Sequence, residues 1–285
     1  MPNTVYQSGR MAHKPVARKA VKAAIRLTHE SRQLRTHNVS TPLHCYDTTR
    51  QELLCEWIDS ITAADRLRQI LHQNPIKHPE LSVFMASLMT ALHQLHRVPA
   101  DCLALRPLDV TRRIAPRLET PGANTSLFRY FLKLRSELKA FSGLTPDHPV
   151  HGDLHVGQLL IDKNDQVWIV DLDDLATGQI ESDLGNFCAH LASHPEFTFN
   201  GILSSWDYWS KIVMHSYQVS SGCPPNWKCM RLYGALALLR RALKITERAG
   251  DNIDYQSCLP EQIIHASRQL FFAAMTTPAN PIHHC

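Results

Sequence analysis

The stretch from Pro149 to Asp183 constrains the fold of this chain more than any other part of the sequence. It contains two short apolar runs, QLLI (158–161) and VWIV (167–170), separated by the polar sequence DKNDQ. Short apolar runs that are partly β-branched, with Asp and Asn at the break, are typical of two strands joined by a tight turn. We therefore predict an antiparallel β-hairpin here.

The hairpin predicts which polar side chains come together. Antiparallel pairing brings the start of the first strand next to the end of the second. Gln158 and the preceding loop 151–157 are thus expected to lie near Asp171 and Asp173. Polar groups that are distant in sequence should converge at this end of the hairpin.

These side chains have the chemistry of a phosphoryl-transfer site. Asp153 follows a glycine and lies between His151 and His155, and a loop carboxylate held by its neighbours can accept a proton. Asp171 ends a strand that we expect to be buried, where a carboxylate needs a cation or hydrogen-bond donors. Gln158 offers an amide oxygen, a ligand suited to Mg²⁺ rather than zinc. Hard oxygen ligands around a metal, with one carboxylate left as base, suit phosphoryl transfer.

A metallohydrolase is the alternative that the same loop leaves open. The sequence HGDLH could supply imidazole and carboxylate ligands to zinc or manganese. Further ligands at a fitting spacing are missing downstream, where His190 and His194 fall in a helical pattern.

Composition narrows the function classes. The chain has 285 residues, enough for one large domain or two lobes, and a formal net charge of +4, too small to indicate a nucleic-acid binder. The positive charge is uneven: eight Lys and Arg but one acid, Glu30, fall between Arg10 and Arg35. This segment is either a solvated helix face or a surface that faces phosphates or a nucleotide.

The cysteines and the apolar runs bear on location. Eight cysteines are scattered without a CxxC pair, several of them in apolar runs. No secretory signal is visible, and no apolar run approaches the roughly 18 residues of a membrane span. We predict a reduced, cytoplasmic protein that does not bind a membrane.

Hydrophobic periodicity divides the chain into a short mixed N-terminal part and a helical remainder. A strand is expected near residues 11–16, a helix over 17–36, and two strands within 43–46 and 52–58. Beyond them we predict helices over 65–73, 80–97, 127–141, 182–193, 203–219, 227–249 and 260–275.

With these residues in place, the chain resembles the aminoglycoside phosphotransferase and choline-kinase-like family. HGDLHVGQLLI, then IVDLDDLATGQIESDL, is similar to the family's catalytic-loop pattern H-G-D-x-H-x-x-N, its strand ending I-D, and G-x-x-x-x-D-L. The family's strand with a lysine and the helix with a glutamate resemble KPVARKAVKAAIRLTHESRQLR. Its strand pair and interlobe hinge resemble PLHCYDTTRQELLCEWIDS, and its helix ending L-x-x-L-H resembles ASLMTALHQLH. The resemblance covers roughly residues 12–250.

The resemblance implies an α+β, protein-kinase-like two-lobed fold. Residues 1–58 would form a short mixed N-terminal lobe on the nucleotide side, and residues 59–285 a mostly helical C-terminal lobe with the embedded β-hairpin. It also implies an ATP-dependent, Mg²⁺-assisted phosphotransferase that acts on a hydroxyl of a small molecule such as a sugar or amino-alcohol-like metabolite.

The resemblance assigns roles around the hairpin. Asp153 would be the catalytic base, and Asp171 the principal Mg²⁺ ligand. Gln158 stands where the family has its metal-binding Asn. His151 would brace the loop from behind, and Asp183 would support the loop from the following helix.

Roles on the nucleotide side are implied in the same way. Lys14 would contact the α- and β-phosphates and pair with Glu30. Apart from the resemblance, we expect Asp173 to be a supporting, hydrogen-bonding group and His155 a structural group of the loop. Backbone groups of the hinge would bind adenine at Glu56, Trp57 and Ile58.

Departures from the family pattern keep a second function open. Gln158 is one methylene longer than Asn, Leu172 replaces an aromatic residue, and Gly9 is the only glycine before Gly122, so no glycine-rich loop can cover the phosphates. A short N-terminal part should lower activity or make it depend on another chain, unless the natural chain starts further upstream. The alternative is a catalytically impaired nucleotide-binding or interaction protein.

The expected partner is a small-molecule hydroxyl substrate, with no nucleic acid and no membrane, and a homodimer stays open. The acceptor is expected near residues 205–217 and 231–241. Few acidic residues occur in these segments, which argues against a polycationic aminoglycoside and favours a neutral sugar or metabolite.

Overall fold

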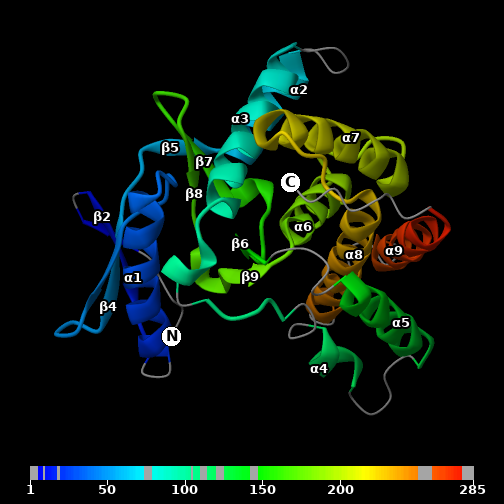
Figure 1. Ribbon diagram of the computed structural model, residues 1–285, viewed down its shortest axis with the longest axis horizontal. Helices are drawn as coiled ribbons and strands as arrows, with labels where there is room; N and C mark the ends of the chain where they lie inside the picture. The colour runs from blue at the N-terminus through cyan, green and yellow to red at the C-terminus, as the bar shows by residue number, and fades with distance from the viewer. Residues whose placement is uncertain are drawn as a thin grey trace.

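The computed structural model describes residues 6–8, 10–17, 20–73, 79–103, 105–109, 114–119, 125–141, 147–249 and 259–277 of the chain. A β-sheet with one helix lies on one side of the molecule and most of the helices lie on the other, with a β-hairpin between them (Figure 1). The N-terminal sheet belongs to the first part of the sequence, as the hydrophobic pattern predicts.

The N-terminal sheet has four antiparallel strands in the order β1-β2-β4-β3. They are β1 (Tyr6–Ser8), β2 (Met11–Pro15), β3 (His44–Asp47) and β4 (Glu52–Glu56). Helix α1 (Val21–Thr36) buries Ala24, Leu27 and Leu34 and contacts β3. It begins later than the predicted residue 17, because no Ser, Thr, Asp or Asn precedes it as a cap and the N-cap residue Ala20 makes no side-chain bond.

The predicted hairpin is present and is part of a three-stranded sheet. Strands β7 (Leu159–Asp162) and β8 (Val167–Ile169) pair antiparallel, with Leu159 opposite Ile169. Strand β5 (Ser60–Thr62) pairs with β7. Strands β6 (His148–Val150) and β9 (Ala176–Gly178) form a separate pair, and β6 leads directly into loop 151–157. Three-residue strands are too short to leave a periodic signal, which is why β5, β6 and β9 were not predicted.

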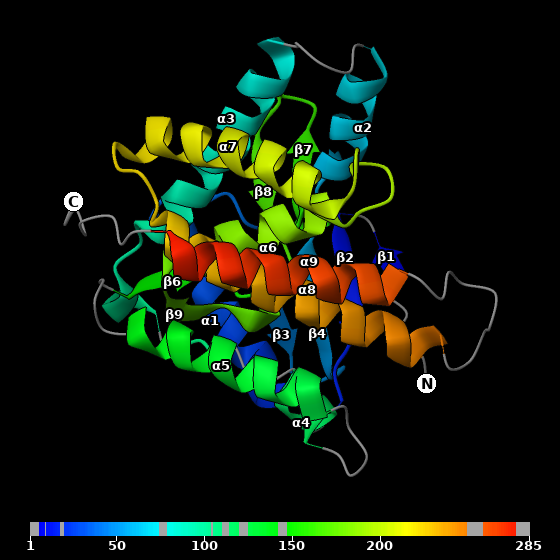
Figure 2. The same ribbon diagram turned by 90° about the vertical axis from the view of Figure 1, so that its right-hand side faces the viewer.

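Helices make up most of the remaining chain. Helix α6 (Ile180–Ala192) is buried on nearly all sides, including its polar residues Glu181, Ser182, Asp183 and Asn186, and it packs against α7 and α8. Helices α8 and α9 lie side by side (Figure 2). The other bounds are α2 (Ala63–Gln73), α3 (Pro79–His96), α4 (Ala115–Leu118), α5 (Thr125–Phe141), α7 (Ile202–Ser221), α8 (Trp227–Ala249) and α9 (Leu259–Thr276). The predicted boundary at residue 58 falls between β4 and β5, and the division into 1–58 and 59–285 stays a prediction.

Helices α6 and α8 approach each other closely at Gly185. A Cβ atom there would lie 2.7 Å from the carbonyl oxygen of Met230 and 2.8 Å from the amide nitrogen of Gly234, both backbone atoms of α8. Only glycine allows this approach. The crossing fixes the distance between the site residues that α6 and α8 carry.

Gly185→Ala is therefore expected to destabilise the protein by about 1–3 kcal/mol, the usual consequence of overpacking a core. The added methyl group would force the two backbones apart. Urea unfolding measures the change. Gly222→Ala is a useful comparison, because Gly222 has a positive φ of 80° but no atom within 4 Å of the added Cβ. Equal losses at the two positions would contradict the importance of the helix contact.

The cysteines depart in part from the expectation of a reduced chain. Cys45, Cys55, Cys102, Cys188 and Cys229 are free, whereas Cys223 is disulfide-bonded. Cys223 lies in the short connection between α7 and α8, outside the apolar core that surrounds Cys188 and Cys229. Over the described residues, no helix is both long and apolar enough to cross a membrane.

Candidate active site

The loop that carries Asp153 is held from behind by Asp183. The Asp183 carboxylate is fully buried in the first turn of α6. Its Oδ2 accepts hydrogen bonds from the backbone N–H of His151 at 2.7 Å and from His96 Nε2 at 3.1 Å, and its Oδ1 accepts one from the N–H of Gly152 at 2.9 Å. The position of Asp183 therefore suits the support role that the sequence predicts.

Two histidines complete this support. Burial lowers the pKa of His96, so its neutral ring donates from Nε2 to Asp183 and accepts at Nδ1 from the Tyr217 hydroxyl, 2.8 Å away. His151 is fully buried, and its Nε2 donates to the carbonyl oxygen of Val170 at 2.9 Å. His151 thereby ties the loop to the end of the hairpin, the brace that the sequence predicts. His96 lies in the quoted motif ALHQLH, but its role was not predicted.

Gly152 is required by the backbone of the loop. Its φ is +80°, and a Cβ atom would lie 2.5 Å from the carbonyl oxygen of Asp174. A larger residue would both strain the backbone and push the loop away from the segment after Asp171. The glycine thus keeps the two acidic segments in contact.

Asp153 is paired with an arginine that sequence analysis did not find. Arg240 of α8 forms an ion pair with Asp153 Oδ1 through Nη2, and the same Nη2 donates to Asn186 Oδ1 at 3.1 Å. Asn186 of α6 in turn donates to the carbonyl oxygen of Leu154 at 2.7 Å. No sequence motif signals Arg240, because 87 residues separate it from Asp153 and only helix packing joins them.

Asp171 and Gln158 meet at the end of the hairpin, as predicted. The side-chain Nε2 of Gln158 donates to Asp171 Oδ2 at 3.1 Å, and Gln158 Oε1 accepts from the N–H of His155 at 3.2 Å. Strand β8 is buried at Val167 and Ile169, as expected, but Asp171 itself is exposed. Strand β8 stops at Ile169, and Asp171 turns out of it with a left-handed φ of 62°, which exposes the side chain. Such backbone strain in a non-glycine residue is frequent at functional sites.

The pairing of Lys14 differs from the expectation. Lys14 Nζ lies 3.4 Å from Asp173 Oδ2, and Glu30 is paired instead with Arg26, whose Nε lies 3.6 Å from Oε2. Arg26 also donates to the backbone oxygen of Asp173 at 3.1 Å. The Lys14–Glu30 pair is not formed, because Glu30 is fully buried against the sheet whereas Lys14 is directed to the exposed acidic segment.

Burial changes the acidity of Glu30. The side chain is 0% exposed, neither carboxylate oxygen has a hydrogen-bond partner, and desolvation, opposed by the Arg26 charge, raises its pKa to about 7. The folded protein therefore keeps a proton that the unfolded chain releases from its ordinary pKa of 4.5 upward.

Stability should consequently fall as the pH rises from about 4.5 to 7, by on the order of 3 kcal/mol, and stay level above that range. Glu30→Gln cannot ionise, so it should lose this dependence and be more stable than wild type at pH 8. Urea unfolding at pH 5 and pH 8 measures both. Glu119→Gln, at an exposed position, should behave like wild type. An unchanged pH profile in Glu30→Gln would contradict the assignment.

The predicted hinge already uses some of its backbone groups. The backbone N–H of Glu56 donates to the carbonyl oxygen of Leu43 at 2.9 Å, and that of Trp57 donates to the carbonyl oxygen of Arg10 at 2.8 Å. Trp57 is 45% exposed. Adenine binding at Glu56, Trp57 and Ile58 stays a prediction, and it would have to use groups other than these two N–H donors.

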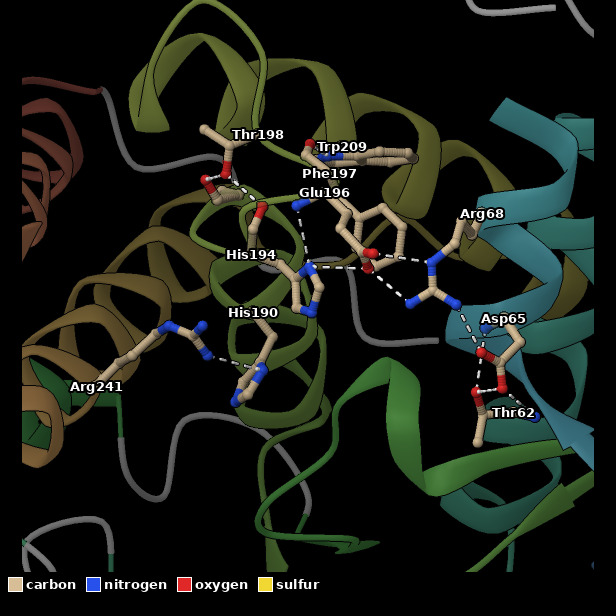
Figure 3. A network of polar contacts seen from close by, with 11 residues as sticks. Thr62, Asp65, Arg68, His190, His194, Glu196, Phe197, Thr198, Trp209 and Arg241 are labelled. Carbon is tan, nitrogen blue, oxygen red and sulfur yellow. Dashed lines mark hydrogen bonds and ion pairs between the residues drawn. The ribbon is translucent and has the colours of Figure 1, made fainter. Parts of the chain in front are cut away.

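His155 makes the contacts of a structural residue. Its Nδ1 accepts from the N–H of Gly157 at 3.1 Å, and its ring stacks on His190 of α6 with 4.6 Å between centroids. Burial lowers the pKa of both rings. Arg241 Nη1 lies 3.4 Å from His190 Nδ1 (Figure 3). A neutral, stacked His155 stabilises the loop, which fits the predicted supporting role.

An ion-pair network anchors the end of α6 to α2 (Figure 3). Arg68 lies 2.6 Å from both Asp65 and Glu196, and Asp65 accepts from the Thr62 hydroxyl at 2.6 Å. His194 is within 3.8 Å of Glu196. These exposed pairs hold the segment after α6 in place and provide no additional catalytic group.

A cavity of about 710 Å³ adjoins Asp153 through Arg240 and Gly152. Its walls come from α1, the segment 105–109, the residues after Asp171, and helices α6 and α8. Of the two segments predicted for the acceptor, 231–241 lines this cavity and 205–217 does not. The volume suits a small molecule.

The residues fit a Mg²⁺ ion better than a zinc centre. Asp171 offers an exposed carboxylate oxygen, a hard ligand of the kind Mg²⁺ takes alongside water and phosphate oxygens. Gln158 could present its oxygen only after its amide turns and releases the bond from His155. Within the described part of the chain, no three His, Cys, Asp or Glu side chains are arranged to hold a metal. The metallohydrolase alternative would also need His151 as a ligand, and His151 Nε2 already donates a hydrogen bond to the carbonyl oxygen of Val170.

Comparisons with solved structures identify the fold. A choline/ethanolamine kinase family protein from Mesorhizobium loti shares 17% identity and a TM-score of 0.61, covering 98% of this chain and 86% of that one. Choline kinase LicA from Streptococcus pneumoniae shares 12% identity and a TM-score of 0.62, and the match covers 94% of this chain and 89% of that one. Aminoglycoside phosphotransferase APH(3'')-Id from Streptomyces rimosus, solved with ADP and streptomycin, shares 17% identity and a TM-score of 0.58. That match covers 83% of this chain and 90% of that one.

These similarities confirm the protein-kinase-like two-lobed α+β fold. The search of curated proteins found no match. The model of the phosphotransferase enzyme family matches residues 10–208, which include both acidic segments and the N-terminal sheet from β2 onward. The chain therefore belongs to the phosphotransferase enzyme family.

Proposed function

We propose that the protein is a small-molecule kinase that transfers the γ-phosphoryl group of ATP to a hydroxyl group, with Mg²⁺ as cofactor. The observation that carries the proposal is the convergence of Asp153, held by the Asp183 loop support, with the exposed Asp171 at the end of the hairpin, next to a cavity of about 710 Å³. Solved relatives of this fold with bound ADP or AMP support the use of a nucleotide.

The residues of the chain have separate tasks in this reaction. Asp153 orients the acceptor hydroxyl and takes its proton, while the acceptor oxygen forms a bond to the γ-phosphorus. The bond to the bridging oxygen breaks, and its electron pair leaves with ADP. Asp171 would hold Mg²⁺ together with Gln158, once the Gln158 amide has turned. When bound, Mg²⁺ would neutralise charge on the phosphates. Lys14, close to Asp173, can move to the phosphates because 40% of its side chain is exposed.

The test is ADP release from Mg·ATP in the presence of hydroxylated metabolites, with ³¹P NMR to identify the phosphorylated product. Acceptor-dependent ADP release is expected for at least one chemical class. ADP release that never exceeds the acceptor-free blank would contradict a kinase.

A catalytically impaired nucleotide-binding protein is the second candidate. Two contacts favour it: Asp153 is paired with Arg240, and Lys14 is paired with Asp173 instead of Glu30. The same assay separates the candidates, because this alternative requires a thermal shift with Mg·ATP but no acceptor-dependent ADP release.

A further inference from the structure

The charges around the cavity beside Asp153 bear on its acceptor. Four cationic side chains line it, from Lys22 and Arg26 on α1, Arg106 in the segment 105–109, and Arg240 on α8. The acidic side chains there are Asp109, Asp173 and Asp174. Asp173 is also paired with Lys14 and Arg240 with Asp153, and both of these partners lie outside the cavity lining, so the cations exceed the acids by one.

The wall formed by α6 and α8, which carries Arg240, has no carboxylate of its own. From α6 and α8 the cavity is lined by Ser182, Asn186, Tyr233, Leu236, Ala237 and Arg240. An amine acceptor would need carboxylates or several aromatic faces here to replace its hydration. This wall instead offers one aromatic ring and one guanidinium.

Arg240 is placed to act on both the base and an anionic acceptor. Its side chain is 20% exposed, and its Nη2 contacts both Asp153 and Asn186. A guanidinium is a planar set of five N–H donors that matches carboxylate or phosphate oxygens. An oxyanion bound by Arg240 would bring a neighbouring hydroxyl of the same molecule next to Asp153.

We propose that the acceptor is a small hydroxylated acid, whose carboxylate or phosphate group binds Arg240 with help from Arg106 and whose hydroxyl is phosphorylated. This inference rests on the proposed kinase function and narrows its substrate class. It replaces the neutral sugar expected from the sequence, and Arg240 becomes the residue that determines specificity.

Binding without nucleotide tests the cavity independently of catalysis. Two sets of probes share a hydroxylated skeleton and differ in charge: glycerate, glycerol 3-phosphate, glycerol and 3-aminopropane-1,2-diol; and glucuronate, glucose and glucosamine. Calorimetry should show the acids binding at least tenfold more tightly than the neutral and amine members. The two anions of the first set distinguish carboxylate from phosphate.

Variants assign the preference to Arg240. Arg240→Gln should weaken binding of the acids about 10–100-fold and leave the neutral members unchanged. Arg240→Lys should restore part of the loss, and Arg129→Gln, at an exposed position on α5 away from the cavity, should have no effect. Neutral or amine members that bind as tightly as the acids overturn the proposal, as does a wild-type protein that binds none of the acids.

Turnover separates this proposal from the kinase function on which it rests. With Mg·ATP, Arg240→Gln should lower kcat/KM for the acids more than for the neutral members. An equal loss for both would show that Arg240 only positions Asp153, and would overturn its role in specificity. Acids that bind through Arg240 without any acceptor being phosphorylated would contradict the kinase function and leave the binding preference standing.

Discussion

Asp153→Asn is expected to lower kcat for acceptor-dependent ADP release by about 10²–10⁴-fold, the range for loss of a general base. Asparagine keeps the shape of the side chain but cannot take the hydroxyl proton. It also leaves the Arg240 guanidinium facing a neutral amide where it now has an ion pair. KM for ATP should change little, because the base that we propose acts on the acceptor and not on the nucleotide.

Steady-state kinetics with saturating Mg·ATP measure this effect once an acceptor is known, and circular dichroism checks the fold. Asp101→Asn, an exposed aspartate in the turn after α3, is the matched control and should keep full activity. An Asp153→Asn enzyme within a few-fold of wild-type kcat would exclude Asp153 as the base.

Asp183→Ala is expected to reduce the free energy of unfolding by about 3–5 kcal/mol, because three buried N–H donors lose their acceptor and each such group costs about 1–3 kcal/mol. The change leaves the N–H groups of His151 and Gly152, and Nε2 of His96, without their acceptor in a fully buried place. Because these groups shape the loop around Asp153, any folded fraction should also lose activity.

Urea unfolding measures this loss of stability, and Asp183→Asn provides a milder variant for comparison. Asparagine keeps one carbonyl acceptor but sets an NH₂ group against an N–H donor, so an intermediate loss is expected. Asp207→Ala, at an exposed position on α7, should leave stability within about 0.5 kcal/mol. If Asp183→Ala matched Asp207→Ala in stability, the buried support would have no energetic importance.

Local patterns accounted for the hairpin end of the site. Two apolar runs and a polar turn between them predict strand pairing, and pairing brings Gln158 to Asp171, where the two are joined at 3.1 Å. The helices were predicted for the same reason, since a buried helix face leaves a repeat in the sequence. The predicted support role of Asp183 came from the family pattern, and its burial agrees with that role.

Contacts between distant elements could not be predicted. Arg240 and Asp153 are 87 residues apart, and Lys14 and Asp173 are 159 residues apart. The sequence does not show which of its many Lys and Arg residues pairs with a given acid, because the choice depends on how the helices and the N-terminal sheet pack. The exposure of Asp171 was missed for a related reason: a left-handed residue after β8 turns the carboxylate away from the strand.

By itself, then, the sequence determined the hairpin and the acidic residues of a phosphotransferase, since each follows from short-range pairing or a contiguous motif. Only the tertiary structure decided which cation contacts each acid and which charges surround the acceptor cavity. The physical reason is that ion pairs depend on distances of a few ångström between side chains, and those distances are set by the packing of α1, α6 and α8 around the loop.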